Sequence, residues 1–168
     1  MEKKEYENDI VYDSYYLVNL FKRDNGRKVT QLQIQKLMYF FEAYYMNVKD
    51  VDSLYDCPFK AWAFGPVAIP LYTRYKNLGD SGIELDEQDE KIGDSITGEK
   101  KKMIEKIYNV FGKKLTAMDL VSYTHMDGSP WSEKWNENEK RIIYGEKSDI
   151  DKIKTKEWFK ENFIKSND

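Results

Sequence analysis

The strongest pattern of apolar and polar positions along the chain is helical and lies between residues 30 and 46. Thr30 and Gln33 form a T-x-x-Q capping box, and Val29 with Ile34 supplies the hydrophobic staple around it. The apolar positions that follow cover most of the helix circumference: Ile34, Leu37, Met38, Phe41 and Tyr45, widened by Leu32, Phe40, Tyr44 and Met46. Because such a helix must be covered on several sides, we expect it at the centre of the fold.

Cap residues, and prolines suited to a first helical turn, predict further helices on both sides of this one. They run from about residue 8 to Asn25-Gly26, from Pro70 to about Asn77, from Thr97 through Phe111, from Thr116 to about His125, from Ser129-Pro130, and over 155–165. In the fourth of these, Asp119 completes a second capping box and Leu115 with Leu120 repeats the staple.

Two stretches lack the helical period. Residues 57–64, CPFKAWAF, are short and aromatic and predict one extended strand that Gly65-Pro66 ends. Residues 80–95 are acidic, and we expect a solvated loop there with at most a short strand at 83–85. The predicted fold class is therefore mainly α: a compact multi-helix domain with at most a small β-strand pair, formed by residues 1–168 as one domain.

Composition narrows the function classes. Aromatic residues make up 15% of the chain, which indicates a packed core, and a net charge of −3 gives no general attraction to nucleic acid. The single cysteine, Cys57, suits a reducing compartment, and no apolar run approaches the length that crosses a bilayer. The polar, acidic start of the chain does not resemble a signal peptide. We expect a cytoplasmic protein with no membrane contact.

The stretch THMDGSPW at 124–131 holds the only histidine, His125, and is the obvious place to look for chemistry. One histidine and one cysteine match no zinc spacing, and the acidic stretch lacks the order of a calcium loop. Serines and threonines surround His125, with Asp119 upstream, but nearness in sequence does not make a catalytic triad. No phosphate-binding glycine motif is present. We therefore expect no catalytic residue, no metal and no cofactor, and a protein that is not an enzyme.

Three alternatives remain open from the residues alone. Thirty acidic residues always permit a carboxylate pair, so a carboxylate-dependent hydrolase stays possible as the least favoured function. Basic clusters at Lys22, Arg23, Arg27 and Lys28, and at 100–102, could touch a phosphate backbone, although solvated helix ends explain them more simply. Several tyrosines and tryptophans could belong to the core or to a protein interface. The partner-binding candidates are Tyr44, Tyr45, Tyr72 and Tyr75, on the two helices beside the GPV turn.

Three segments in order resemble a known family. LQIQKLMYFFEAYY, KAWAFGPVAIPLYTRY and LTAMDLVSYTHMDGSPW are similar to the Panacea domain, also called the SocA-like or phage-associated GepA-type domain, over roughly residues 8–140. The residues that carry the resemblance are Gln35, Lys36, Leu37, Tyr39, Trp62, Gly65, Pro66, Val67, Tyr72, Thr124, His125, Pro130 and Trp131. The family pattern has a glutamate shortly before the final Pro-Trp, where this chain has Asp127-Gly128-Ser129.

The resemblance implies a mostly helical antitoxin of a toxin–antitoxin system. Its partner would be a protein toxin encoded by an adjacent gene, neutralised by direct contact. The alternative that it also implies is a proteolytic adaptor, which delivers its toxin to a protease. It implies no catalytic residues and no cofactor. We accordingly interpret the motif residues as structural: His125 would hydrogen-bond across a helix–corner–helix turn, and Trp131 would be buried beneath it.

Overall fold

The computed structural model describes the backbone of residues 2–164 and the side chains of residues 9–164. Over this part of the chain the fold is mainly α, as predicted. The helices are α1 (Glu2–Arg23), α2 (Gln31–Lys49), α3 (Ile69–Tyr75), α4 (Glu87–Asp94), α5 (Gly98–Ile107), α6 (Ala117–Thr124), α7 (Pro130–Glu137) and α8 (Lys152–Phe159), with two strands, β1 (Phe59–Trp62) and β2 (Gly65–Ala68). Short 3₁₀ turns occupy Lys76–Leu78 and Glu146–Ser148, and π-helical turns extend α5 over Tyr108–Gly112 and α8 over Lys160–Ile164.

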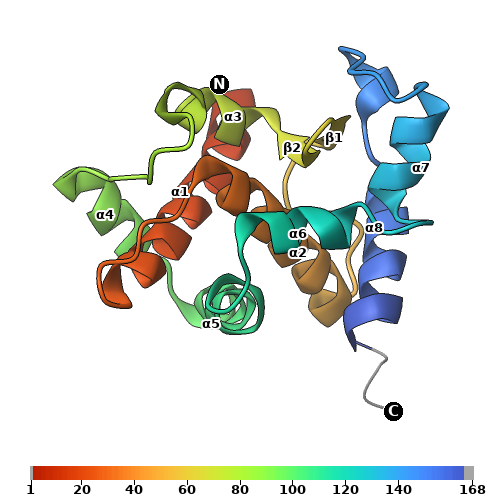
Figure 1. Ribbon diagram of the computed structural model, residues 1–168. Helices are drawn as coiled ribbons and strands as arrows, with labels where there is room; N and C mark the ends of the chain where they lie inside the picture. The colour runs from red at the N-terminus through yellow and green to blue at the C-terminus, as the bar shows by residue number, and fades with distance from the viewer. Residues whose placement is uncertain (1, 165–168) are drawn as a thin grey trace.

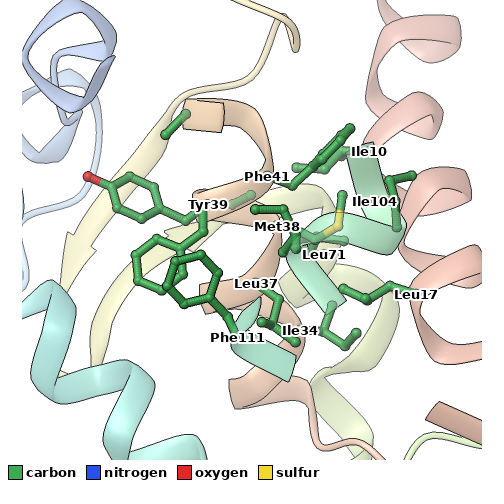
Figure 2. Packing of buried hydrophobic residues seen from close by; sticks show 14 of the residues in the cluster. Ile10, Leu17, Ile34, Leu37, Met38, Tyr39, Phe41, Leu71, Ile104 and Phe111 are labelled. Atoms are coloured by element: carbon green, nitrogen blue, oxygen red, sulfur yellow. The ribbon is translucent and has the colours of Figure 1, made fainter. Parts of the chain in front are cut away.

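Helix α2 runs through the middle of the molecule, with α1 on one side and α8 on the other (Figure 1). Its residues from Ile34 to Ala43 are all buried, which confirms the prediction of a central helix. Figure 2 shows its side chains meeting Ile10 and Leu17 of α1, Leu71 of α3 and Ile104 of α5. No helix of residues 2–164 combines the length and the apolar character needed to cross a bilayer.

The predicted helix starts are confirmed at three positions. Both hydrogen bonds of the capping box form at Thr30 with Gln33 and again at Thr116 with Asp119. Ser129 Oγ accepts from the backbone N–H of Ser132 at 3.0 Å, and Pro130 occupies the first turn of α7. Thr97 precedes α5, but its side chain makes no capping hydrogen bond.

The expectation of a loop over 80–95 was wrong, because residues 87–94 form α4. Asp86 caps this helix by accepting from the N–H of Asp89 at 2.8 Å, and acidic residues in the first turn suit the positive end of the helix dipole. Gly93 lets α4 approach α1 closely, since a Cβ there would lie 2.8 Å from the backbone of Tyr15 and Tyr16. Eight residues are too few to show a clear helical period of apolar positions. The contact of α4 with α1, which the sequence does not reveal, stabilises the helix.

The predicted extended segment is confirmed as β1, but the short strand allowed at 83–85 is absent. Residues 83–85 form no strand, and Gly65-Pro66 begins β2 instead of only ending β1. The two strands are antiparallel, pairing Phe59 with Ala68 and Trp62 with Gly65, so that Ala63 and Phe64 form the turn of a hairpin. Ile83 instead donates its backbone N–H to the carbonyl of Val29 at 2.8 Å.

Candidate partner-binding surface

The hairpin β1–β2 is held along the outer edge of β2 by side chains of α2. The Gln35 side-chain amide donates to the carbonyl of Ala68 at 3.1 Å and accepts from the N–H of Ala68 at 2.8 Å. These are the two bonds that a neighbouring strand would make, so Gln35 closes an edge that would otherwise be left unpaired. Its side chain is buried, and its role here is structural.

Lys36 closes the same edge one residue further along α2. Its Nζ donates to the carbonyl of Pro66 at 2.9 Å, and the side chain is completely buried. Burial away from water lowers the pKa of Lys36 to about 7, and no carboxylate among the described residues forms an ion pair with it. A buried lysine beneath the hairpin was not predicted, because lysine side chains are almost always exposed.

The corner between α6 and α7 packs against the other side of the hairpin. His125 stacks on Trp131 with ring centroids 3.7 Å apart and planes 3° from parallel. Trp131 is buried, as predicted, and its Nε1 donates to the carbonyl of Trp62 in β1 at 2.7 Å. The hydrogen bond predicted for His125 is not made by its buried Nε2, which has no partner in the part of the chain with described side chains. Ser129 makes the corner bond instead, since its Oγ donates to the carbonyl of Thr124 at 2.7 Å.

His125 is therefore a stacking residue of the corner. Burial lowers the pKa of His125, and the nearby positive charge of Lys36 lowers it further. The lowered pKa keeps the imidazole neutral at pH 7, where it packs flat on the indole in this half-buried corner. Thr124, also buried, donates its hydroxyl to the carbonyl of Val121 at 2.8 Å and ends α6 beside the hairpin.

Lys36 makes the stability of the fold depend on pH. An unfolded lysine has a pKa of about 10.4, so between about pH 7 and 10 the unfolded chain binds one more proton than the folded one. The free energy of unfolding should then rise with pH, by up to about 1.4 kcal/mol per unit. Lys36→Met should remove this slope in urea titrations between about pH 7.5 and 9. The matched variant Lys106→Met changes an exposed lysine and should keep it. Equal slopes in wild type and Lys36→Met would contradict the lowered pKa of Lys36.

Above this braced hairpin lies an apolar hollow of about 490 Å³, which we call the hairpin hollow. Four large apolar side chains at its wall are exposed: Phe64 (65%), Met118 (61%), Ile142 (43%) and Tyr72 (40%). They come from the hairpin turn, α6, the loop after α7 and α3. The hollow is completed by Thr30, Gln31, Leu32, Gln35, Trp62, Ala63, Val67, Gly79, Asp80 and Ala117, of which only Asp80 carries a charge.

The four tyrosines proposed as partner-binding lie in different places. Tyr72 lines the hairpin hollow and meets the Trp62 ring edge-on at 5.1 Å. Tyr75 is 1% exposed, with its hydroxyl 2.6 Å from Ser14 Oγ, so it belongs to the core of the unbound protein. Tyr45 is half-buried against Phe41, and Tyr44 lines a separate groove near α8. Only Tyr72 is thus at the hollow.

Phe64, Met118 and Ile142 were not predicted as surface residues, although two of them carry a signal in the sequence. Phe64 is a large apolar residue in a two-residue hairpin turn, where polar residues are usual. Met118 lies off the buried face of α6, which carries Leu120, Val121 and Thr124. Ile142 stands in an irregular loop and gives no signal of its own, because its position depends on how that loop returns to the hairpin.

The remaining motif residues support the same core. Leu37 is fully buried in α2, and the hydroxyl of Tyr39 lies 2.9 Å from Thr155 Oγ1 of α8. Pro66 and Val67 are buried in β2, and Pro130 is buried at the start of α7. The motif therefore positions the hairpin, and through it the exposed wall of the hollow.

The basic cluster near the end of α1 has carboxylate partners. Lys22 pairs with Glu90 and Arg23 with Asp94, both at 2.5 Å, while Lys28 pairs with Glu84 at 2.8 Å and Arg27 with Asp24 at 3.4 Å. Two of the acids belong to α4, so the acidic stretch neutralises the cluster. The cluster offers little free charge to a phosphate backbone.

The buried carboxylates also have partners of their own. Asp13 accepts from the hydroxyl of Tyr55 at 2.5 Å and pairs with Lys100, and Glu42 pairs with Lys152 at 2.7 Å. Burial raises the pKa of Asp13, and the charge of Lys100 opposes this shift. No group of three or more His, Cys, Asp or Glu side chains suited to a metal occurs among the described residues.

A family model described as antitoxin SocA-like, Panacea domain, matches residues 34–132. This range is more than half of the chain and holds every residue on which the resemblance was based, from Gln35 to Trp131. It also holds Phe64, Tyr72 and Met118 of the hairpin hollow. No curated protein and no solved structure matches the chain.

Proposed function

The chain belongs to the SocA-like antitoxin family with the Panacea domain, and from this premise we propose that it neutralises a cognate protein toxin by direct contact at the hairpin hollow. The toxin would be the product of an adjacent gene. The family supports an antitoxin, and therefore non-enzymatic, role, and it implies a toxin as partner. The hollow is our candidate for where that partner binds.

The observation that carries this proposal is the gathering of exposed apolar side chains at one hollow. Phe64 and Met118 each leave more than 60% of their side chains in water, which costs free energy in the unbound protein. An apolar wall with a single charged residue, Asp80, has the composition of the buried centre of a protein interface. Covering it with a partner would recover that free energy.

Rigid support for the turn is the second argument. The hairpin is bonded by Gln35 and Lys36 along β2 and by Trp131 at the Trp62 carbonyl of β1, all within the residues that the family model matches. A side chain on a rigid hairpin loses little conformational entropy when it enters a partner. The motif would thus serve binding indirectly, by fixing Phe64 in an exposed position.

Co-expression tests the proposal. The wild-type chain should restore growth to cells that express the neighbouring toxin, and the two proteins should co-purify. Phe64→Ser should remain folded, because Phe64 is largely exposed, and should weaken the complex by about 30-fold, the effect of losing an interface anchor worth about 2 kcal/mol. Met118→Ser should act in the same direction.

Tyr144→Ser is the matched control, because Tyr144 is 83% exposed and lines none of the cavities described here. It should bind and rescue like wild type. If Phe64→Ser and Tyr144→Ser neutralised the toxin equally well, the hairpin hollow would not be the binding site. If the wild-type chain restored growth against none of the products of neighbouring genes, the antitoxin role itself would be overturned. Rescue without a stable complex, with loss of the toxin that requires a host protease, would support the adaptor alternative.

We also propose that residues 1–168 act as one domain and that the complex forms in the cytoplasm. One continuous core cluster includes residues from α1 to α8, which supports a single folding unit. The single cysteine supports a reducing compartment.

A further inference from the structure

A second apolar groove lies where the ends of α5 and α8 meet α6, and we call it the α5–α8 groove. It has a volume of about 330 Å³ and shares no lining residue with the hairpin hollow. Its wall consists of Tyr44, Lys106, Ile107, Val110, Phe111, Lys114, Leu115, Tyr123, Phe159, Phe163 and Ile164. Val110 is 47% exposed and Tyr123 and Ile164 are each 37% exposed, so the groove opens to solvent.

The floor of the groove is a cluster of mutually packed aromatic rings. Phe163 contacts Phe111 at 5.2 Å, Phe159 at 5.0 Å and Tyr123 at 5.6 Å between ring centroids. Phe111 and Phe159 are buried and continue into the core through Phe40. An incoming apolar side chain would therefore meet a preformed aromatic surface.

Both π-helical turns of the described chain border this groove. Tyr108–Gly112 contributes Val110 and Phe111, and Lys160–Ile164 contributes Phe163 and Ile164. π-helical turns are rare, and they occur often at functional sites. Each turn thus supplies two of the apolar residues that line the groove.

The charges at the groove are both positive. Lys106 and Lys114 are its only charged lining residues, both are exposed, and neither forms an ion pair with another described side chain. The protein as a whole carries a net charge of −3, and the hairpin hollow has an aspartate. A cationic apolar groove on an acidic protein is complementary to a partner that combines carboxylates with apolar side chains.

We propose that the α5–α8 groove docks a short acidic segment of a protein partner, with apolar side chains on the aromatic floor and carboxylates beside Lys106 and Lys114. An amphipathic helix with anchors one turn apart suits a groove of this kind. This contact is separate from the binding of toxin at the hairpin hollow and does not depend on it.

Selection from a phage-displayed library of random peptides of about 12 residues, with the full-length chain as bait, tests the proposal. Enriched peptides should combine Asp or Glu with Leu, Phe or Trp. A synthetic peptide of the enriched sequence should bind Lys106→Glu/Lys114→Glu on the order of tenfold more weakly than wild type, and its affinity should fall as salt is raised. Val110→Asp, which adds a charge to the apolar wall, should weaken binding as well.

The matched control is Lys101→Glu/Lys102→Glu, which makes the same charge change at two exposed lysines of α5 that do not line the groove. It should bind the peptide like wild type, and so should Phe64→Ser. The proposal would be overturned if the selected peptides were not enriched in Asp or Glu, or if both double-lysine variants weakened peptide binding equally. It would also be overturned if Phe64→Ser no longer bound the peptide. If a single-stranded oligonucleotide bound more tightly than the peptide, and if this binding required Lys106 and Lys114, the groove would be a nucleic-acid site instead.

Discussion

Trp131→Ala is expected to lower the free energy of unfolding by about 3–5 kcal/mol, the range for deleting a buried large aromatic side chain. The indole is 5% exposed and is stacked between His125, at 3.7 Å, and Trp135, at 5.5 Å. Its removal would also leave the carbonyl of Trp62 without the Nε1 donor that it accepts from at 2.7 Å. Urea denaturation followed by circular dichroism measures the loss.

Trp135→Ala makes the same change at the next indole of the stack, which is only half-buried. It should cost less than half as much, because Trp135 packs against the cluster from its partly exposed side. Similar losses at both positions would show that the corner is held by bulk hydrophobic area rather than by the specific placement of Trp131 beneath the hairpin.

Gly65→Ala is expected to destabilise the fold by about 2–6 kcal/mol through two effects of similar size. Gly65 has φ of +106°, a backbone conformation that residues with a Cβ rarely adopt. A Cβ there would also lie 2.6 Å from Lys36 Cε and 2.9 Å from Thr124 Oγ1. Both neighbours are buried, so neither can move into solvent to relieve the contact.

Gly128→Ala separates these two effects. Gly128 has φ of +81°, but a Cβ there would meet nothing within 4 Å. Its cost should be about 1–2 kcal/mol, from the backbone alone. Because both glycines have a positive φ and only Gly65 has close neighbours, the difference between the variants measures the close contact of the hairpin with Lys36 and Thr124. Equal losses in the free energy of unfolding would mean that the hairpin can move away from Lys36 and Thr124 at little cost.

The local chemistry of the helix starts could be predicted from the sequence, because a capping box needs only residues three apart. Thr30 with Gln33 and Thr116 with Asp119 behave as their spacing predicts. The central position of α2 was predictable as well, since no exposed helix could carry so many apolar residues. The family resemblance rested on ordered motifs and is confirmed over residues 34–132.

The sequence predictions were wrong where contacts between distant segments determine the local structure. Helix α4 is short and polar, and the approach of Gly93 to α1 fixes it. Lys36 is buried because the edge of β2 offers it the carbonyl of Pro66, which no spacing along the chain reveals. His125 was expected to use its polar atoms, but the parallel indole of Trp131 engages its flat face. Tyr75 was grouped with Tyr72 by helical proximity, although the two point to different sides of α3.

The candidate surface was the least predictable feature. Phe64, Tyr72, Met118 and Ile142 come from four segments, and only the folded hairpin brings them to one hollow. The sequence offered several aromatic residues either for the core or for a protein interface, but it could not separate the two groups. The structure makes that separation for the unbound protein: Tyr75 is buried and Tyr72 is exposed.

Site-specific photo-crosslinking tests the central claim, that the toxin binds at the hairpin hollow, most directly. A photoreactive phenylalanine analogue in place of Phe64 should crosslink to the co-expressed toxin, since that side chain is exposed at the turn. The same analogue in place of Val48, half-exposed on α2 and outside the hollow, should not. Crosslinking from position 48 but not from position 64 would contradict the account.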